Sequence, residues 1–178
     1  AYELGLSEVM NYSFVGEKML NNCCMPSEKE LKLQHPASTF LDRLRRNLVP
    51  GMLDQIGGNL RFFNTFGLFE IGRVYLKDDP TSKDIANEQT YLVASLVNKG
   101  DDDFFVLKGM IERYLQRVHL NGATFEPLTE RSLGWVHPGQ AVSIKAHNQV
   151  IGHITSLHPE VAKNHNVSRH KVVIAELS

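Results

Sequence analysis

Histidine is the residue type in this sequence that most invites a metal or proton-transfer site, since 178 residues include eight of them. The closest pairs are His153 with His158 and His165 with His170, and the members of each pair stand five residues apart. Ligands on one helix face stand four residues apart, and no aspartate or glutamate completes a compact set here. We therefore expect surface or capping histidines and no metal site.

No other motif for catalysis is complete. The sequence has no Gly-x-Ser-x-Gly elbow, no P-loop and no dinucleotide-binding glycine pattern. The carboxylates of Asp101, Asp102 and Asp103 could hold Mg²⁺, but acidic residues before a helical stripe more simply complement the positive start of that helix. The two cysteines, Cys23 and Cys24, are adjacent, and neighbouring cysteines bridge only with strain. We expect reduced thiols in a cytosolic protein.

Two local clusters could bind a ligand. Arg43, Arg45 and Arg46 supply three cations within four positions, and arginine suits phosphate contacts, including those of RNA. A solvated or subunit-facing charged segment is the commoner outcome for such a run. Trp135 lies beside a turn at Pro138–Gly139, where a tryptophan is more often a packed lid than a ligand-binding ring.

Composition limits the broad class of the protein. The sequence holds 19 Lys and Arg against 20 Asp and Glu, a formal net charge of -1, whereas a general polyanion binder needs a cationic excess. No apolar run approaches the ~20 residues that cross a bilayer. The length suits one domain. Because the chain begins at Ala1 and stops within an apolar run, we expect a single domain over 1–178 cut from a longer chain.

The elements that must position these residues follow from hydrophobic periodicity. Apolar residues alternate or run together, as in strands, over 10–14, 66–75, 87–97, 141–146, 150–156 and 172–177. Helical spacing predicts one helix over Pro50–Leu60, although this segment contains Gly57 and Gly58. It predicts a second helix from Phe104 to Val118, with Asp103 as its N-cap. A short helical turn follows Pro159. This order predicts an α+β fold with a largely antiparallel sheet and helices packed on it.

Several short motifs follow one another in an order typical of one known family. They are Leu4–Phe14, His35–Pro36, Leu44–Leu53, Leu68–Tyr75, Phe104–Gly109, His137–Gly139 and Leu157–Glu160. In this order they resemble the synthetase-like core of the phenylalanyl-tRNA synthetase beta chain, bacterial type. The sequence departs from the family at His35, where asparagine is usual, and at Thr155–Ser156, where a Gly-Glu-like pair is common.

The resemblance implies the class II aminoacyl-tRNA synthetase fold, an antiparallel sheet flanked by helices. It also indicates which residues a catalytic member of this class would need. Class II chemistry needs an arginine just after the strand that ends at Tyr75, because adenylate formation builds negative charge at phosphorus. Leu76 stands there, and the last strand carries Glu176 where a Gly-rich arginine segment is expected. We expect the synthetase shape without its ATP site, and no catalytic, cofactor-binding or metal-binding residue.

The resemblance also implies a partner. In this family two alpha and two beta chains assemble in the cytoplasm, and the alpha chain joins phenylalanine to tRNA using ATP and Mg²⁺. The present chain would then be a non-catalytic part of a ligase that packs against alpha and meets tRNA only through the assembly. We expect the contact face to lie on the segment Leu4–Phe14 and the helix from Pro50. Its residues would be Glu8, Met10, Tyr12, Phe14, Pro50, Leu53, Gly57, Gly58 and Leu60.

Three other functions stay open. A stand-alone domain that activates an amino acid with ATP is one, and an RNA-binding module that uses Arg43, Arg45 and Arg46 is another. The third is an amino-acid sensor, because synthetase-like domains elsewhere take that role.

Overall fold

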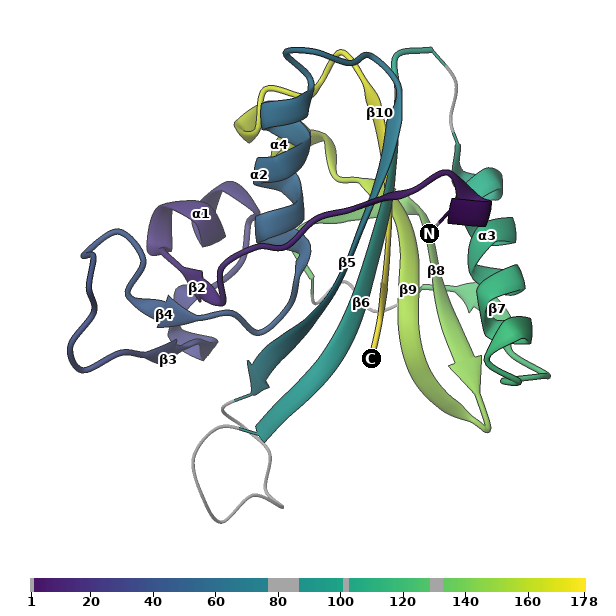
Figure 1. Cartoon of the computed structure of the whole chain (residues 1–178), viewed down its shortest axis with the longest axis horizontal. Helices are drawn as coiled ribbons and strands as arrows, with labels where there is room; N and C mark the ends of the chain where they lie inside the picture. The colour runs from purple at the N-terminus through teal and green to yellow at the C-terminus, as the bar shows by residue number, and fades with distance from the viewer. Residues whose placement is uncertain (1, 77–86, 101–102, 129–132) are drawn as a thin grey trace.

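A seven-stranded sheet in the strand order β1-β5-β6-β10-β9-β8-β7 forms the centre of the computed structural model, which describes residues 2–76, 87–100, 103–128 and 133–178 (Figure 1). A small second sheet has the order β2-β4-β3. The strands are β1 (Ser7–Glu8), β2 (Phe14–Val15), β3 (Leu31–Lys32), β4 (Arg43–Leu44), β5 (Phe66–Leu76), β6 (Asn87–Asn98), β7 (Thr124–Pro127), β8 (Val136–Ala146), β9 (Gln149–Leu157) and β10 (Lys171–Leu177). The helices are α1 (Glu17–Asn22), α2 (Val49–Asn59), α3 (Phe104–Arg117) and α4 (Pro159–Asn164), with short 3₁₀ turns at Tyr2–Leu4 and Ser27–Lys29.

The strands of the large sheet pair antiparallel, except that β1 lies parallel to β5. β5 and β6 pair along their whole length, and β10 fills the space between β6 and β9. The β8–β9 hairpin turns at His147 and Asn148, whose φ angles are 50° and 64°. Positive φ at both central residues matches the twist of the flanking strands, so this two-residue turn sets the hairpin register. The fold class expected from the sequence is therefore confirmed.

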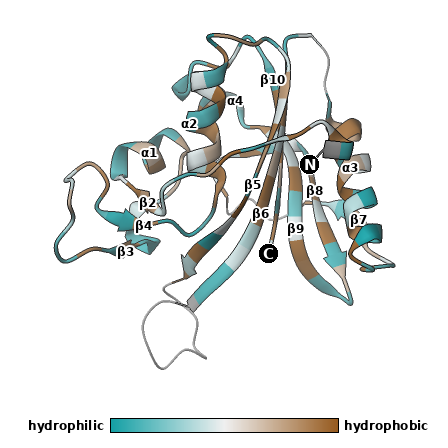
Figure 2. Cartoon of the chain, in the orientation of Figure 1, coloured by the Kyte–Doolittle hydropathy of each residue, from teal (hydrophilic) through white to brown (hydrophobic). Residues whose placement is uncertain are grey.

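Both faces of the central strands are buried, each against different helices. Along β10, Val172 and Ile174 belong to the core that contains α2, whereas Val173 and Ala175 belong to the core under α3. Figure 1 shows these two helices on opposite sides of the sheet, and Figure 2 shows hydrophobic positions concentrated along the central strands. A strand covered on both faces reads as a continuous apolar run, which is the pattern of Val172–Ala175.

The two long helices form where helical spacing predicts them. In α2, Met52, Leu53 and Ile56 are fully buried against the sheet. In α3, Leu107, Ile111 and Leu115 form the buried stripe. Asp103 occupies the N-cap position of α3, but its side chain makes no capping hydrogen bond. Asp103 therefore does not make the expected capping hydrogen bond and contributes only its negative charge near the start of the helix.

The expected strand over residues 10–14 is wrong. β1 ends at Glu8 and β2 begins at Phe14. Between them Val9 N–H still donates to the carbonyl of Phe69 at 2.8 Å and the carbonyl of Ser13 accepts from Arg45 N–H at 3.0 Å, but residues 10–12 are in no strand. The alternation survives in the side chains, since Met10 and Tyr12 point outward with 88% and 82% of their surface exposed. The backbone N–H of Asn11 donates to the carboxylate of Glu70 instead of to a neighbouring strand. A polar side chain therefore replaces the strand ladder at this point.

Candidate functional site

A buried polar network fixes the N-terminal segment against the sheet. Asn11 donates to the Glu70 carboxylate from its backbone N–H at 3.3 Å and from Nδ2 at 2.6 Å. Arg45 donates from Nη1 to Glu70 Oε1 at 2.7 Å and from Nε to the carbonyl of Arg73 at 2.9 Å. Gln55 of α2 donates to Asn11 Oδ1 at 3.0 Å. Because Glu70 and Arg45 are almost entirely buried, their charges depend on each other and on these hydrogen bonds.

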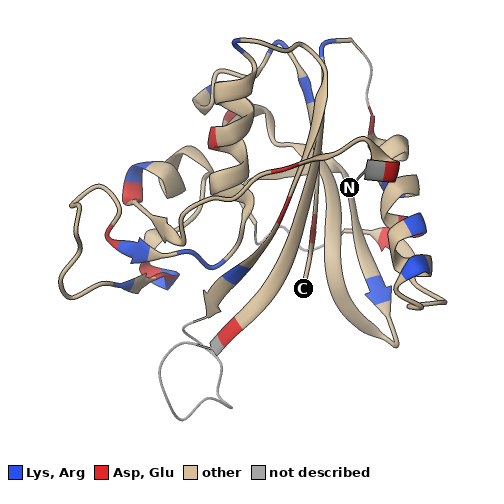
Figure 3. Cartoon of the chain, viewed as in Figure 1, with Lys and Arg blue, Asp and Glu red and all other residues tan. Residues whose placement is uncertain are grey.

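Two glycines leave the space that this network occupies. A Cβ at Gly72 would overlap the Arg45 guanidinium, and a Cβ at Gly51 would lie 3.1 Å from Cβ of Asn11. Both glycines belong to segments that stood out in the sequence, Leu68–Tyr75 and Leu44–Leu53. Residues from several separate sequence motifs therefore meet in this one network. Figure 3 shows acidic positions midway along the central strands, and a charge there is the sequence signal that could have revealed Glu70.

The network holds a surface of exposed hydrophobic side chains in place. Met10 and Tyr12 flank Asn11 and face outward, Phe14 follows on β2, and Phe40 is 85% exposed. The backbone of Phe40 lies beside Gly16, which follows β2, because a Cβ at Gly16 would overlap the Phe40 carbonyl. We call Met10, Tyr12, Phe14 and Phe40 the N-terminal apolar surface. Figure 1 shows the segment that carries the first two residues crossing the sheet and α2. Large exposed apolar side chains held by a rigid support are typical of protein contact sites.

The helix residues expected at the contact face divide into two groups. Pro50 and Leu53 lie buried in the core of this chain, so their side chains are not available to a partner and the expected face needs correction there. Gly57 is partly exposed, Gly58 is exposed and Leu60 is partly buried. A Cβ at Gly58 would meet nothing within 4 Å, so no neighbouring backbone in this chain requires a glycine there. Glu8 of β1 is exposed.

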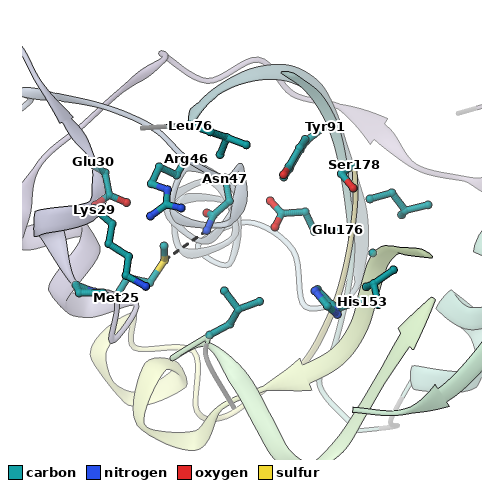
Figure 4. Close-up of a pocket in the computed structure, with 15 residues that line it drawn as sticks. Met25, Lys29, Glu30, Arg46, Asn47, Leu76, Tyr91, His153, Glu176 and Ser178 are labelled. Atoms are coloured by element: carbon teal, nitrogen blue, oxygen red, sulfur yellow. Dashed lines mark hydrogen bonds between the residues drawn. The ribbon is translucent and has the colours of Figure 1, made fainter. Parts of the chain in front are cut away.

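The larger cavity, about 410 Å³, lies where β6 begins and β10 ends. Figure 4 shows Tyr91 and Glu176 on one side of it, Lys29 and Glu30 on the other, and Asn47 between them. Glu176 Oε1 accepts a hydrogen bond from the backbone N–H of Leu48 at 2.8 Å. Burial raises the pKa of Glu176 to about 7, although this hydrogen bond and the nearby Arg45 favour the charged form. Burial and Glu176 raise the pKa of Tyr91.

The charges around this cavity are of both signs. Lys29 and Arg46 are the cationic side chains of its lining, and Glu30 and Glu176 oppose them. Leu76, at the position where the resemblance calls for a cation, also lines the cavity. Burial also raises the pKa of Glu30, although the nearby Arg46 and Arg43 favour its charged form.

The arginine run does not form one exposed patch. Arg45 is 5% exposed and committed to Glu70, so an RNA contact through Arg45 is wrong. Arg43 pairs with Asp42 and with Glu17, the latter at 3.7 Å. Arg46 alone of the three faces the large cavity.

A thiol, an imidazole and a carboxylate come together beside α2. Cys23 Sγ lies 3.5 Å from His165 Nε2, and His165 Nδ1 lies 3.8 Å from Asp54 Oδ1. Burial, with smaller contributions from Asp54 and Cys24, raises the pKa of Cys23 to about 12, and its side chain has no exposed surface. A nucleophilic cysteine needs a thiolate and access for a substrate, and Cys23 has neither.

Two of the remaining candidates, His158 and Trp135, have structural roles. His158 caps α4 by accepting a hydrogen bond from the backbone N–H of Glu160. Trp135 is fully buried, as expected of a packed lid. Both cysteines are free thiols. Among the described residues no group of His, Cys, Asp or Glu could hold a metal ion, and no helix is long and apolar enough to span a bilayer. Asp101 and Asp102 lie outside the described residues.

Comparison with known proteins places these features in a family. A family model described as the phenylalanyl tRNA synthetase beta chain CLM domain matches residues 1–178. The phenylalanine–tRNA ligase beta subunit of Clostridium acetobutylicum is 29% identical over 97% of this chain and 22% of its own length. The corresponding subunit of Bacillus licheniformis is 30% identical over 92% of this chain and 21% of its own length. The chain therefore spans about a fifth of the length of these relatives.

The fold also matches a solved synthetase structure. A pyrrolysyl tRNA synthetase, PylSc of Desulfitobacterium hafniense, superposes with a TM-score of 0.79 at 14% identity, covering 99% of this chain and 61% of the synthetase.

Proposed function

Since the chain belongs to the family of phenylalanyl-tRNA synthetase beta chain CLM domains, we propose that it is a non-catalytic docking module for the alpha subunit of phenylalanine–tRNA ligase. In this proposal the enzyme contains two alpha and two beta chains and works in the cytoplasm. The alpha subunit supplies the site that uses ATP and Mg²⁺ to attach phenylalanine to tRNA. The present chain holds neither of these groups and reaches tRNA only through the assembly.

The observation that carries the proposal is the N-terminal apolar surface. Met10 and Tyr12 expose more than four-fifths of their surface, yet the residue between them is bound by three hydrogen bonds to Glu70 and Gln55. A chain without a partner gains nothing from holding large apolar side chains rigidly in water. A preorganised surface of this kind lowers the entropy cost of association. Exposed Gly58 on α2 adds a place where a second backbone can approach closely.

The charges of the large cavity support the non-catalytic half of the proposal. Glu176 lines that cavity with Glu30, and Leu76 stands where a cation would be needed. Such a lining offers little stabilisation to the charge that develops at phosphorus during adenylate formation.

Association with the alpha subunit tests the docking role directly. The protein that contains this chain is mixed with the alpha subunit of its own enzyme, and complex formation is followed by light scattering and sedimentation. We expect Met10→Glu and Tyr12→Glu each to weaken association at least about thirtyfold, the effect of losing a hot spot of some 2 kcal/mol. Phe105→Glu is the matched control, since Phe105 is 81% exposed on α3 across the sheet. Equal affinities for all variants would remove the N-terminal apolar surface from the interface.

A second experiment separates docking from catalysis. Phenylalanine-dependent exchange of pyrophosphate into ATP is measured with the chain alone, and we expect none above background. Exchange by the isolated chain would favour the stand-alone activating domain instead.

A further inference from the structure

A second cavity, about 250 Å³, lies at the opposite end of the sheet from the large one, where β6 ends and β10 begins. Three basic residues contribute to its lining, Lys99 just after β6, and Arg169 and Lys171 at the start of β10. They are far apart in the sequence and meet because β6 and β10 are antiparallel neighbours, with Asn98 opposite Lys171. Figure 3 shows basic positions at this end of the sheet.

The positive charge of this second cavity is not neutralised within the described chain. No acidic residue is among the described residues that line it. Lys99, Arg169 and Lys171 take part in none of the ion pairs that the described residues form. The three residues are exposed, so water and salt weaken the repulsion among their charges, and an anion in the cavity is attracted by all three.

Buried polar atoms without partners line the same cavity. Ser156 is 9% exposed, and its hydroxyl has no hydrogen-bond partner in the part of the chain that the structure describes. Neither ring nitrogen of His170 has a partner there, although both atoms are shielded from solvent. A buried hydroxyl or imidazole without a partner costs free energy, so its presence calls for a ligand that supplies the missing bond.

We propose that this second cavity binds a phosphate group. The hydroxyl of Ser156 and an N–H of His170 donate to its oxygens, while Lys99, Arg169 and Lys171 neutralise its charge. Tetrahedral oxyanions accept several charge-assisted hydrogen bonds at once, and arginine and lysine are the side chains that commonly supply them. The volume is below the roughly 300 Å³ at which pockets for drug-sized ligands begin, so it suits a phosphate group rather than a whole nucleotide.

Inorganic phosphate is the first probe. Its binding to the purified chain is measured by calorimetry and by chemical-shift changes in ¹H–¹⁵N spectra, in a phosphate-free buffer. We expect saturable binding that shifts the backbone signals of Ser156, His170 and Lys171. The double variant Arg169→Ala/Lys171→Ala weakens it by about tenfold or more, because hydrogen bonds to charged groups are lost. Lys18→Ala/Lys163→Ala removes the same charge from exposed positions outside the cavity and leaves the affinity unchanged.

Ser156→Ala separates binding from folding. Because the Ser156 hydroxyl is buried without a partner, its removal leaves the melting temperature unchanged or raises it. The same change weakens phosphate binding severalfold if the hydroxyl is a ligand. Full affinity in Ser156→Ala and in the Arg169→Ala/Lys171→Ala variant, or no saturable binding to the parent chain, would overturn the proposal.

A short RNA with a 5′-hydroxyl end identifies the source of the phosphate group, because its only phosphates are internal diesters. If the source is RNA, the logarithm of the affinity falls with the logarithm of salt concentration, and losing two cations flattens that slope by about 1.4 for a single strand. If inorganic phosphate binds and this RNA does not, the site takes free phosphate. Both results support a phosphate-group site, whereas a chain that does not bind inorganic phosphate contradicts it, whether or not it binds the RNA.

Discussion

A carboxyl group in the middle of a covered sheet must find compensating groups or give up its charge, and Glu70 and Glu176 take these two courses. Glu70 keeps Arg45 and Asn11 as partners. Glu176 has the backbone N–H of Leu48 and a more distant Arg45, which do not offset its burial, so its pKa rises to about 7. The two residues therefore affect stability in different ways, one through ion pairing and the other through pH.

The stability of the chain is expected to fall with rising pH because of Glu176. Its folded pKa of about 7 lies above the ordinary 4.5, so the folded form holds a proton that the unfolded form releases between these values. The contribution is complete below pH 4.5 and is lost as pH rises through 7, a difference of about 3 kcal/mol. Glu176→Gln keeps an acceptor for Leu48 and removes the titration. Urea unfolding at pH 5, 6, 7 and 8 measures the effect.

The variant itself serves as the control for Glu176, because all other titrating groups are common to both proteins. The difference in unfolding free energy between Glu176→Gln and the parent chain is expected to grow with pH. Parallel pH profiles would mean that Glu176 is already ionised in the folded chain.

The Arg45–Glu70 pair is expected to be worth far more than an ion pair at the surface. Arg45→Met leaves a buried carboxylate without its cation, which costs about 3–5 kcal/mol of unfolding free energy. Arg73→Met is the matched control, since the Arg73–Glu88 pair, at 3.0 Å, is largely exposed. Its loss costs less than about 1 kcal/mol. Chemical denaturation compares the two variants, and similar losses would contradict the view that burial decides the value of the pair.

At the scale of elements, the apolar periodicity of the sequence predicts the strands and helices whose apolar side chains form the core. Strands β5, β6, β9 and β10 and helices α2 and α3 appear where apolar spacing predicts them, because each buries the side chains that make the pattern. The failure at residues 10–14 has a local cause, since the alternation there reflects outward-facing Met10 and Tyr12 and not a paired strand. Periodicity records which side chains share a face, but it does not say whether another strand accepts the backbone hydrogen bonds.

Helix α2 offers a test of why it contains glycines. Gly58 is exposed on the helix with open space around it, so Gly58→Ala is expected to raise the unfolding free energy by about 0.5–1 kcal/mol. Gly51→Ala, in the same helix, is expected to lower it, because the new Cβ meets Asn11, which Glu70 and Gln55 hold in place. Urea denaturation of both variants gives the signs. A destabilising Gly58→Ala would mean that the helix itself needs the glycine.

At the scale of the whole molecule, one sheet carries two hydrophobic cores, and the N-terminal segment crosses it to reach α2 (Figure 1). The sequence predicted a contact face at residues close together in the chain, Met10, Tyr12 and Phe14, and the structure leaves all three exposed. It did not indicate Phe40, or the pairing of Arg45 with Glu70 across 25 positions, because only the folded chain brings these together. It also assigned Pro50 and Leu53 to the face, since helical spacing does not distinguish a side that covers the sheet from a side that meets a partner.

The N-terminal apolar surface is expected to contribute nothing to the stability of the chain that bears it. Met10 and Tyr12 have most of their surface in water already, so the double variant Met10→Ser/Tyr12→Ser removes little buried area. Its unfolding free energy should stay within about 0.5 kcal/mol of the parent value, the range of surface substitutions. Its binding of a hydrophobic dye and its self-association should fall, because the exposed patch is gone. Denaturation, dye fluorescence and sedimentation measure these three quantities on the same samples.

The control variant Leu53→Ser shows why both the unfolding free energy and the dye binding must be measured. Leu53 is fully buried, so that change should cost several kcal/mol by leaving a cavity and a buried hydroxyl, and dye binding should rise as the core loosens. A surface kept for a partner therefore responds in the opposite direction from a core. If Met10→Ser/Tyr12→Ser destabilised the chain as Leu53→Ser does, the two side chains would be packed within this chain, and the docking surface would have to be sought elsewhere.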